Sequence, residues 1–411
     1  LATAAANTAF RGIAFAPEVL DLVVTTSTGA KKVDGGAYRN IYVDDALVSV
    51  AGLSATGTVT LDSNGSFDPG YSPLTGPASF SMPRNTINQA GLLTIRHPEG
   101  LSLTGATGQI QVTGTRSYGG GYGSFVFFNE NNVPQVTGPG FPDVVNSITN
   151  FANRDVTLSR PLSVRIVAQL GTNGLVLNGQ ALTLLSTTTP QPGAGDGQAY
   201  VTLSPNSSAN IIGNTTTVQR AIKNPTAIGY RHYSSPVSGE TLGTLATAGF
   251  TPTFNSTYNT SPTPNLVTPF PTVFGYDETR LRPAASGGSP ATNFTNSFDK
   301  GWFSPTAATP WATAQGYTVN IPRTALVDFT GQVNSGDIER TGLTRTTADG
   351  GWHLLGNPYP ETISWSGASR SADPGSAATL AGMDAAIYVY EASSQYGGSY
   401  RSYVNNVGDP R

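Results

Sequence analysis

Short runs of β-forming residues recur along the first half of the chain, and turn-forming or polar residues separate them. Each run is only about three to five residues long, as in Thr-Val-Thr-Leu at residues 58–61. A strand of this length cannot bury an apolar core by itself, so the segments must stack on one another or pair into sheets. The pattern predicts an all-β fold. Further runs lie at residues 41–43, 46–50, 92–95, 101–103, 109–113, 156–158, 162–166, 175–177 and 182–184.

Two architectures account for these segments in residues 1–220, and both stay open from the sequence alone. A β-solenoid explains them because short strands that stack as rungs bury a continuous core. A β-sandwich is also built from short strands and turns. The spacing between segments varies from roughly five residues to roughly thirty or more, so no repeat period decides between the two.

Composition agrees with many short strands and excludes several partners. Only 11% of the 411 residues are charged, against about 25% in ordinary soluble proteins, while Gly (48) and Pro (29) are plentiful. The net charge of −3 gives no electrostatic footprint for nucleic acid or for anionic lipid. Cysteine is absent, which excludes a disulfide framework and thiolate chemistry. No apolar run approaches the roughly 18 to 20 residues of a membrane helix, so membrane insertion is not expected.

The most organised stretch is Gly-Trp-His-Leu-Leu-Gly-Asn-Pro-Tyr-Pro at residues 351–360. Apolar side chains alternate with small or polar ones here and beyond, which predicts a strand that buries one face. The apolar positions are Trp352, Leu354, Ile363 and Trp365. Glycine and asparagine tolerate unusual backbone angles, and proline fixes φ and removes a donor, so the strand should end in a rigid corner. The corner residues are Gly356, Asn357, Pro358, Tyr359 and Pro360.

This stretch resembles a module repeated across large secreted and surface proteins of Bacteroidota, which are typically exported by the type IX secretion system. Three other segments fit the module, namely Tyr-Arg-His-Tyr-Ser-Ser-Pro-Val at 230–237, Phe-Gly-Tyr-Asp-Glu at 274–278 and Ala-Ile-Tyr-Val-Tyr at 386–390. The resemblance covers residues 226–404. It implies a cell-surface or extracellular location, and because the family shares no catalytic residues it implies no reaction.

A domain boundary is expected between residues 220 and 226. There, Val-Gln-Arg-Ala-Ile-Lys-Asn-Pro at 218–225 closes a strand with basic residues and a proline, and aromatic residues become frequent afterwards. We expect a repetitive short-strand domain over residues 1–220. Residues 226–411 are then expected to form a jelly-roll-like β-sandwich that contains the 351–360 motif.

Few patterns point to catalysis. The three histidines have no metal-ligand spacing, and no serine lies in Gly-x-Ser-x-Gly. Two carboxylates would have to face each other across a cleft for glycoside hydrolysis, and the sequence cannot place such a pair. No catalytic residue and no enzyme activity are therefore predicted.

One loop is a candidate for calcium. Asp62, Asn64 and Asp68 place oxygen ligands around a glycine, as calcium loops do, although the bidentate Glu at the twelfth position is missing. An Asn-Gly turn between two strands explains the same residues without a metal. No other cofactor is expected.

The sequence is interpreted as that of a non-catalytic structural or adhesive protein that polymerises into a filament. The chain stops just after a strand where the family module continues, and an incomplete sheet offers an edge that a neighbouring subunit's strand can fill. The residues expected at this contact are Leu1, Phe10, Phe15, Tyr400, Tyr403 and Val404. The alternative is a carbohydrate-binding module of a polysaccharide-degrading protein, because clustered tyrosines can stack on sugar rings of surface glycans.

Overall fold

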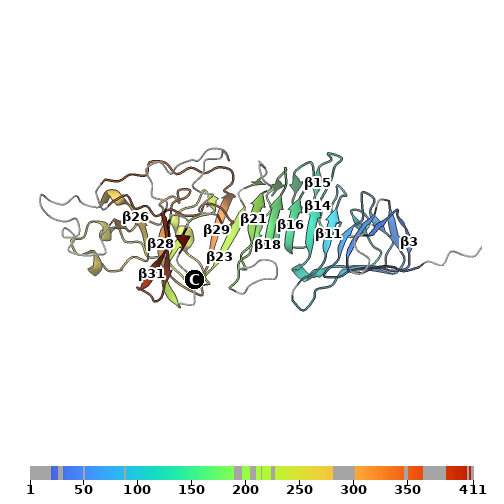
Figure 1. Cartoon of the computed structure of the whole chain (residues 1–411), viewed down its shortest axis with the longest axis horizontal. Coiled ribbons are helices and arrows are strands. Elements are labelled where there is room, and N and C mark those ends of the chain that lie inside the picture. The colour runs from blue at the N-terminus through green and yellow to red at the C-terminus, as the bar shows by residue number, and fades with distance from the viewer. Residues whose placement is uncertain are drawn as a thin grey trace, which may run out of the picture.

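The computed structural model describes residues 20–25, 31–49, 51–87, 89–188, 197–203, 210–213, 215–223, 227–280, 301–346, 350–363, 386–404 and 407–408. Nearly all of its regular elements are strands, which confirms the all-β fold class. The helices in these ranges are 3-10 turns, and none is long and apolar enough to cross a membrane. The molecule is elongated, and its strands lie across the long axis (Figure 1).

The first part is built from rungs that each add one strand to three parallel sheets. The first sheet contains β1 (Leu22–Val24), β4 (Ile41–Val43), β7 (Thr58–Leu61), β10 (Ser79–Met82) and β13 (Thr115–Tyr118). The second begins with β2 (Lys31–Val33), β5 (Ala46–Ser49), β8 (Ser66–Asp68), β11 (Leu92–Ile95) and β14 (Ser124–Phe127). The third contains β3 (Gly36–Tyr38), β6 (Leu53–Ala55), β9 (Leu74–Thr75) and β12 (Ile110–Gln111).

Later rungs extend the second sheet and start a fourth one. The second sheet continues through β16 (Val144–Asn150), β18 (Leu162–Leu170), β20 (Leu182–Leu184), β21 (Tyr200–Leu203) and β23 (Thr216–Ala221). The fourth contains β15 (Gln135–Val136), β17 (Val156–Thr157), β19 (Leu175–Val176) and β22 (Ile211–Ile212). Parallel stacking of this kind is a β-solenoid. The sandwich alternative is therefore wrong for the described part of residues 1–220.

Apolar side chains in register hold the rungs together. Leu47, Phe67, Leu93, Phe125 and Ile148 are cross-strand partners along the second sheet, and all are buried. Because side chains alternate between the two faces of a strand, a slip of one residue would move this whole column to the solvent. Burial of one face therefore fixes the register of strands that are too short to fix it alone.

Buried amide side chains satisfy the backbone at the turns between rungs. Gln109 accepts hydrogen bonds from the N–H groups of Arg96 (2.6 Å) and His97 (2.8 Å), and it donates to the carbonyl of Gly70 (3.2 Å). Asn150 likewise donates to the carbonyl of Gly174 at 2.8 Å. Buried backbone groups need partners, and the sheet ladders do not reach these corners. The Gln and Asn residues are thus part of the solenoid's internal structure.

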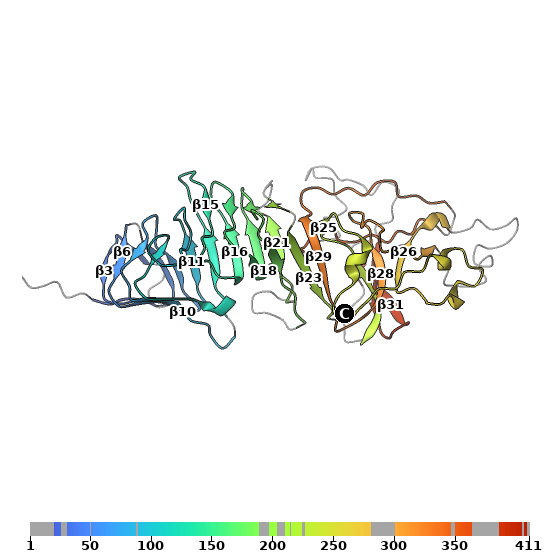
Figure 2. The same cartoon turned by 180° about the vertical axis from the view of Figure 1, so that it is seen from behind.

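The parallel order ends at β23, but the sheet continues. Strand β29 (Leu326–Val333) pairs antiparallel with β23, and β25 (Val237–Ser238) pairs with β29. The resulting 12-stranded sheet runs from the solenoid into the C-terminal part (Figure 2). One continuous core of buried residues extends from Leu22 to Val333. The predicted boundary thus coincides with a change of strand direction that the sheet and the core both cross.

A second antiparallel sheet packs over the end of this one. Its strands are β24 (Ile228–Tyr233), β28 (Tyr317–Pro322), β26 (Val273–Tyr276) and β27 (Trp302–Phe303). The ring of Trp311 lies between the two layers, with its centroid 5.5 Å from that of Tyr317 and 5.3 Å from that of Phe329. The C-terminal sandwich therefore takes one of its layers from the solenoid sheet. Its jelly-roll connectivity stays a prediction.

Short elements complete the fold. One 3-10 turn, η1 (Gly119–Gly121), lies in the solenoid. The C-terminal part contains the others, η2 (Leu242–Leu245), η3 (Ser256–Asn259), η4 (Pro264–Leu266) and η5 (Glu278–Arg280). A separate antiparallel sheet consists of β30 (Ala386–Ala392), β31 (Gly398–Val404) and β32 (Val407–Gly408). Its β30–β31 hairpin lies close to β24, because a Cβ added at Gly229 would lie only 2.9 Å from Cβ of Ala392.

The prediction of a strand at the 351–360 motif is wrong. Residues 350–354 form no strand, and an isolated bridge joins Leu355 to Gln315. Trp352 is 55% exposed, and Ile363 is also exposed. The neighbouring segment turns at Ala314, which has φ of +60°, so it offers no straight edge along which a ladder could extend. Trp365 lies outside the described residues.

Candidate functional site

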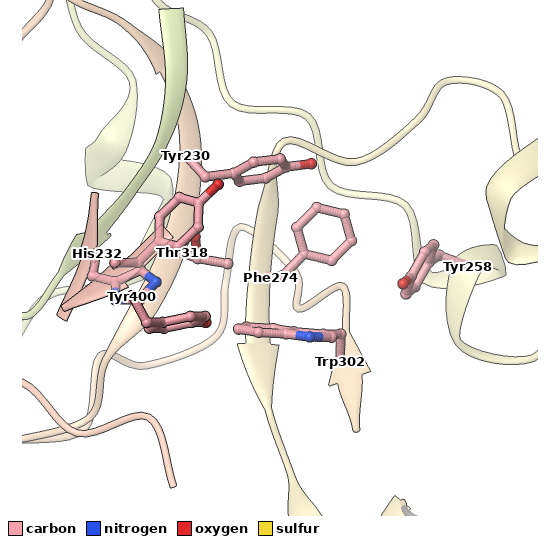
Figure 3. Close-up of a pocket in the computed structure, with 8 residues that line it drawn as sticks. Tyr230, His232, Tyr258, Phe274, Trp302, Thr318 and Tyr400 are labelled. Carbon is pink, nitrogen blue, oxygen red and sulfur yellow. The ribbon is translucent and has the colours of Figure 1, made fainter. Parts of the chain in front are cut away.

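A pocket lined mainly by aromatic side chains lies in the C-terminal part, where the β24 sheet meets the β30–β31 hairpin (Figure 3). Its cavity volume is about 180 Å³. We call it the aromatic pocket. Its lining residues are Tyr230, His232, Tyr258, Phe274, Trp302, Thr318, Tyr390 and Tyr400.

Strand register brings one row of the lining together. Tyr230 and His232 are two residues apart on β24 and so point to the same face. His232 lies directly opposite Thr318 on β28, which in turn lies opposite Phe274 on β26. Cross-strand partners share a face, so these three side chains form a continuous row from three strands.

Two further aromatic rings extend this row. Trp302 comes from β27, the outer strand of the sheet. Tyr258 comes from η3 and packs edge-on against Phe274, with ring centroids 5.1 Å apart. A reciprocal pair of hydrogen bonds holds η3 beside β27: Asn259 donates to the carbonyl of Ser304 (2.9 Å) and accepts from its N–H (2.7 Å). The positions of Trp302 and Tyr258 are thereby linked.

The β30–β31 hairpin supplies the remaining wall. Tyr390 and Tyr400 are direct cross-strand partners, with ring centroids 5.2 Å apart in an edge-to-face arrangement. His232 stacks on Tyr390 at 5.8 Å and an interplanar angle of 25°. Such ring contacts add about 0.5 to 1.5 kcal/mol each beyond area burial. They therefore help to hold the hairpin against β24.

The pocket lining carries no charge at neutral pH. Burial lowers the pKa of His232 to about 4, because loss of water disfavours the imidazolium. Burial also raises the pKa of Tyr230, Tyr390 and Tyr400, so their hydroxyls stay protonated. Among the lining residues that the structure describes, none is a carboxylate, a lysine or an arginine. The lining thus offers ring faces, hydroxyls and one neutral imidazole.

The rim of the pocket is open and continues as an exposed aromatic row. Tyr400 is 54% exposed although it lines the pocket. Tyr388 lies two residues before Tyr390 on the same face of β30, and its ring contacts that of Trp352 at 5.3 Å. Tyr388 and Trp352 are both exposed. A ligand that fills the pocket can therefore extend along further aromatic surface.

Nearby carboxylates have structural partners. Glu278 accepts hydrogen bonds from the hydroxyl of Thr344 and from the N–H and the hydroxyl of Thr346 (both 3.0 Å). The bond from Thr344 is the main cause that lowers the pKa of Glu278 to about 2. Asp277 accepts from the N–H and hydroxyl of Thr279. The structure thus places Glu278 as an anchor for residues 344–346 and Asp277 in a local turn.

The calcium candidates are not brought together as a ligand set. Asp62 accepts a hydrogen bond from the hydroxyl of Tyr42 at 2.6 Å, whereas Asp68 forms an ion pair with Arg96 at 2.7 Å. Asn64 donates its amide to Asp44. Across the described ranges, no group of three or more His, Cys, Asp or Glu side chains could hold a metal ion. The turn interpretation accounts for this loop.

The corner of the 351–360 motif exists even though its strand does not. Asn357 accepts a hydrogen bond from the N–H of Tyr359 at 2.9 Å and donates to the carbonyl of Glu361. A Cβ at Gly356 would lie 2.1 Å from Cβ of Ser234, so this position has room only for glycine. Pro358 and Pro360 are buried. The motif residues therefore serve the packing of the sandwich.

The expected subunit-contact residues fall into two groups. Leu1, Phe10 and Phe15 lie outside the described residues. Tyr400, Tyr403 and Val404 are on β31, where Tyr400 lines the aromatic pocket and the other two are half-buried. Their role in a subunit contact stays a prediction.

Most of the pocket was not predicted from the sequence. The sequence points to Tyr400 as a subunit-contact residue, but it does not predict that His232, Thr318, Phe274 and Tyr258 line a pocket. The one local signal was the alternation of Tyr230 and His232 along a strand. The cross-strand partners of these residues lie more than forty positions away in the sequence, because β26 and β28 begin only at Val273 and Tyr317.

Comparison of the chain with protein-family models, with curated proteins and with solved structures finds no match. The resemblance to surface proteins of Bacteroidota stays a prediction.

Proposed function

We propose that this chain is a non-catalytic structural and adhesive protein of a bacterial cell surface or of the extracellular space. In this proposal the solenoid is a stiff spacer and the C-terminal sandwich is a binding head. The proposal rests mainly on the 12-stranded sheet that runs from one part into the other. Eleven of its strands follow one another, and at about 4.8 Å per strand they span about 50 Å.

The architecture suits a spacer because each rung contacts only its neighbours, so added rungs lengthen the molecule without changing its cross-section. The strands β26, β28 and β31, which carry residues of the aromatic pocket, lie at the opposite end of the molecule from β3 (Figures 1 and 2). Exposed aromatic residues beside that pocket are typical of interaction surfaces. The resemblance to type IX secretion cargo supports the same location.

Localisation and adhesion together test the proposal. Immunogold electron microscopy of the cells that make the protein should place it on the outer surface or on released material. Deletion of its gene should reduce retention of the cells on a substratum, and complementation should restore it. Label confined to the cell interior, or unchanged retention of the deletion strain, would refute this function.

A filament is a second form of the proposal, and the first rung favours it. Within the described residues, β1, β2 and β3 each pair with one neighbour in their sheets, which leaves a parallel edge. Leu20 and Val23 are exposed at this end. Light scattering coupled to size exclusion should then show oligomers that grow with concentration, whereas a constant monomer mass would exclude the filament.

A further inference from the structure

We infer that the aromatic pocket binds one neutral pyranose ring of a glycan, with the ring stacked on aromatic faces and its hydroxyls bonded to the polar groups of the lining. This inference rests on the proposed adhesive function and names the class of ligand that the head recognises.

The size of the cavity suits a single ring. Its volume of about 180 Å³ equals the share of about six water molecules in the liquid. Pockets for drug-sized ligands are larger, roughly 300 to 1,000 Å³. A longer chain can be accommodated only outside the pocket, where Tyr388 and Trp352 continue the aromatic surface from the rim.

The lining matches the two kinds of surface that a sugar presents. A pyranose has apolar C–H faces and a rim of hydroxyls, and tyrosine combines an apolar ring with a polar tip. Thr318 and His232 add a hydroxyl and ring nitrogens in the row described above.

Charge and hydrogen bonding exclude two other classes of ligand. An anionic ligand would need a cationic partner, and the described part of the lining contains neither lysine nor arginine. A quaternary ammonium ion can bind between aromatic rings, but it forms no hydrogen bonds. It would leave the Thr318 hydroxyl and the His232 imidazole buried without partners. A neutral ligand with hydroxyl groups satisfies both requirements.

Binding to the full chain tests the inference. Tryptophan fluorescence and calorimetric titration would use glucose, galactose, mannose and N-acetylglucosamine, with choline and glucuronate as the charged probes. We expect the binding signal of at least one neutral sugar to saturate, with a Kd of about 10 mM or below, an affinity in the range of a single sugar ring. Choline and glucuronate should not saturate in the same range. Saturation by choline alone, or no saturation by any neutral sugar, would overturn the inference.

Three variants locate the site. Tyr400→Ala changes a side chain that is already half-exposed, and Trp302→Ala removes a ring of the wall; each should weaken sugar binding about tenfold, the effect of one lost stacking contact. Trp352→Ala is the matched control, because this tryptophan lies outside the pocket and should leave monosaccharide binding within about twofold. Equal binding by Tyr400→Ala and the wild type would also overturn the inference.

The outcomes separate this inference from the proposed function. Cells that carry Tyr400→Ala should lose glycan-dependent retention but keep the protein on their surface. Surface display and adhesion that persist without any sugar binding would leave the structural role intact and remove only the sugar site.

Discussion

At the scale of the residue, burial decides what individual polar groups do. His232 has no cationic role at neutral pH, because partial burial beside Tyr390 lowers the pKa of its imidazole. Gln109 has no exposed surface, and its amide replaces the backbone partners that a turn lacks. The sequence alone does not distinguish Gln109 from half-buried glutamines such as Gln111, or His232 from the other two histidines.

The first prediction concerns pH. The unfolded chain protonates His232 near pH 6.5, whereas the folded protein does so only near pH 4. The unfolded state therefore binds more protons than the folded state between these two pH values. The contribution of neutral His232 to the free energy of unfolding is fully present above pH 6.5. It falls by up to about 3 kcal/mol as the pH drops to 4. His232→Phe should lose this part of the pH dependence. Urea unfolding of both proteins from pH 7 to 4.5 measures the difference, and parallel pH profiles would contradict it.

The second prediction concerns the internal amides of the solenoid. Gln109→Leu leaves the N–H groups of Arg96 and His97 and the carbonyl of Gly70 without their partner. At about 1 kcal/mol or more for each buried group, the loss should be about 3 to 5 kcal/mol of unfolding free energy. Gln111→Leu is the control, because this half-buried amide donates to one carbonyl at 3.2 Å. Chemical denaturation should show a loss of about 1 kcal/mol or less for the control.

At the scale of the element, close approach between segments builds the aromatic pocket. The β30–β31 hairpin can contribute Tyr390 and Tyr400 only because β24 has a glycine where the hairpin crosses it. Its edge-to-face tyrosine pair and the stacked His232 then fix its position. The pocket therefore depends on how an element docks as well as on which residues line it.

The third prediction tests this docking. A Cβ at Gly229 would lie 2.9 Å from Cβ of Ala392 and from the carbonyl oxygen of Ser394, so Gly229→Ala must displace the hairpin. We expect a loss of about 1 to 3 kcal/mol and faster hydrogen exchange in residues 386–404. Gly52→Ala is the control, since its nearest neighbour would be Cβ of Ser72 at 3.5 Å, an ordinary contact. Unchanged exchange in the hairpin of Gly229→Ala would show that its docking does not need this space.

At the scale of the whole molecule, the solenoid and the head share a sheet and a core. Val218 of β23 lies opposite Phe329 of β29, and both are buried. Residues that share a core tend to unfold together, whereas separate domains melt independently. The spacer and the head should accordingly behave as one mechanical unit.

The fourth prediction follows from this coupling. All four tryptophans come after residue 226, so tryptophan fluorescence reports the head. Most parallel strands precede residue 222, so far-ultraviolet circular dichroism reports mainly the solenoid. In urea the two signals should change at the same midpoint. A separate fluorescence transition would show that the continuous sheet does not couple the two parts.

The sequence by itself determined the fold class and the kind of core. Period-two alternation and short strands with turn residues between them are local properties, so they predict strands and leave stacked rungs as one of two solutions. The same local reasoning identified the corner at Asn357. It was wrong about the strand at Trp352, where no ladder forms beside the turn at Ala314 and the expected buried face is exposed at Trp352 and Ile363.

Only the tertiary structure decided the solenoid, the partners of Asp62 and Asp68, and the aromatic pocket. The pocket joins residues from Tyr230 to Tyr400 across separate strands and a 3-10 turn. Contacts between distant segments depend on the register and direction of every strand between them, and no local pattern encodes those. The sequence therefore specified the strands, and their packing specified the site.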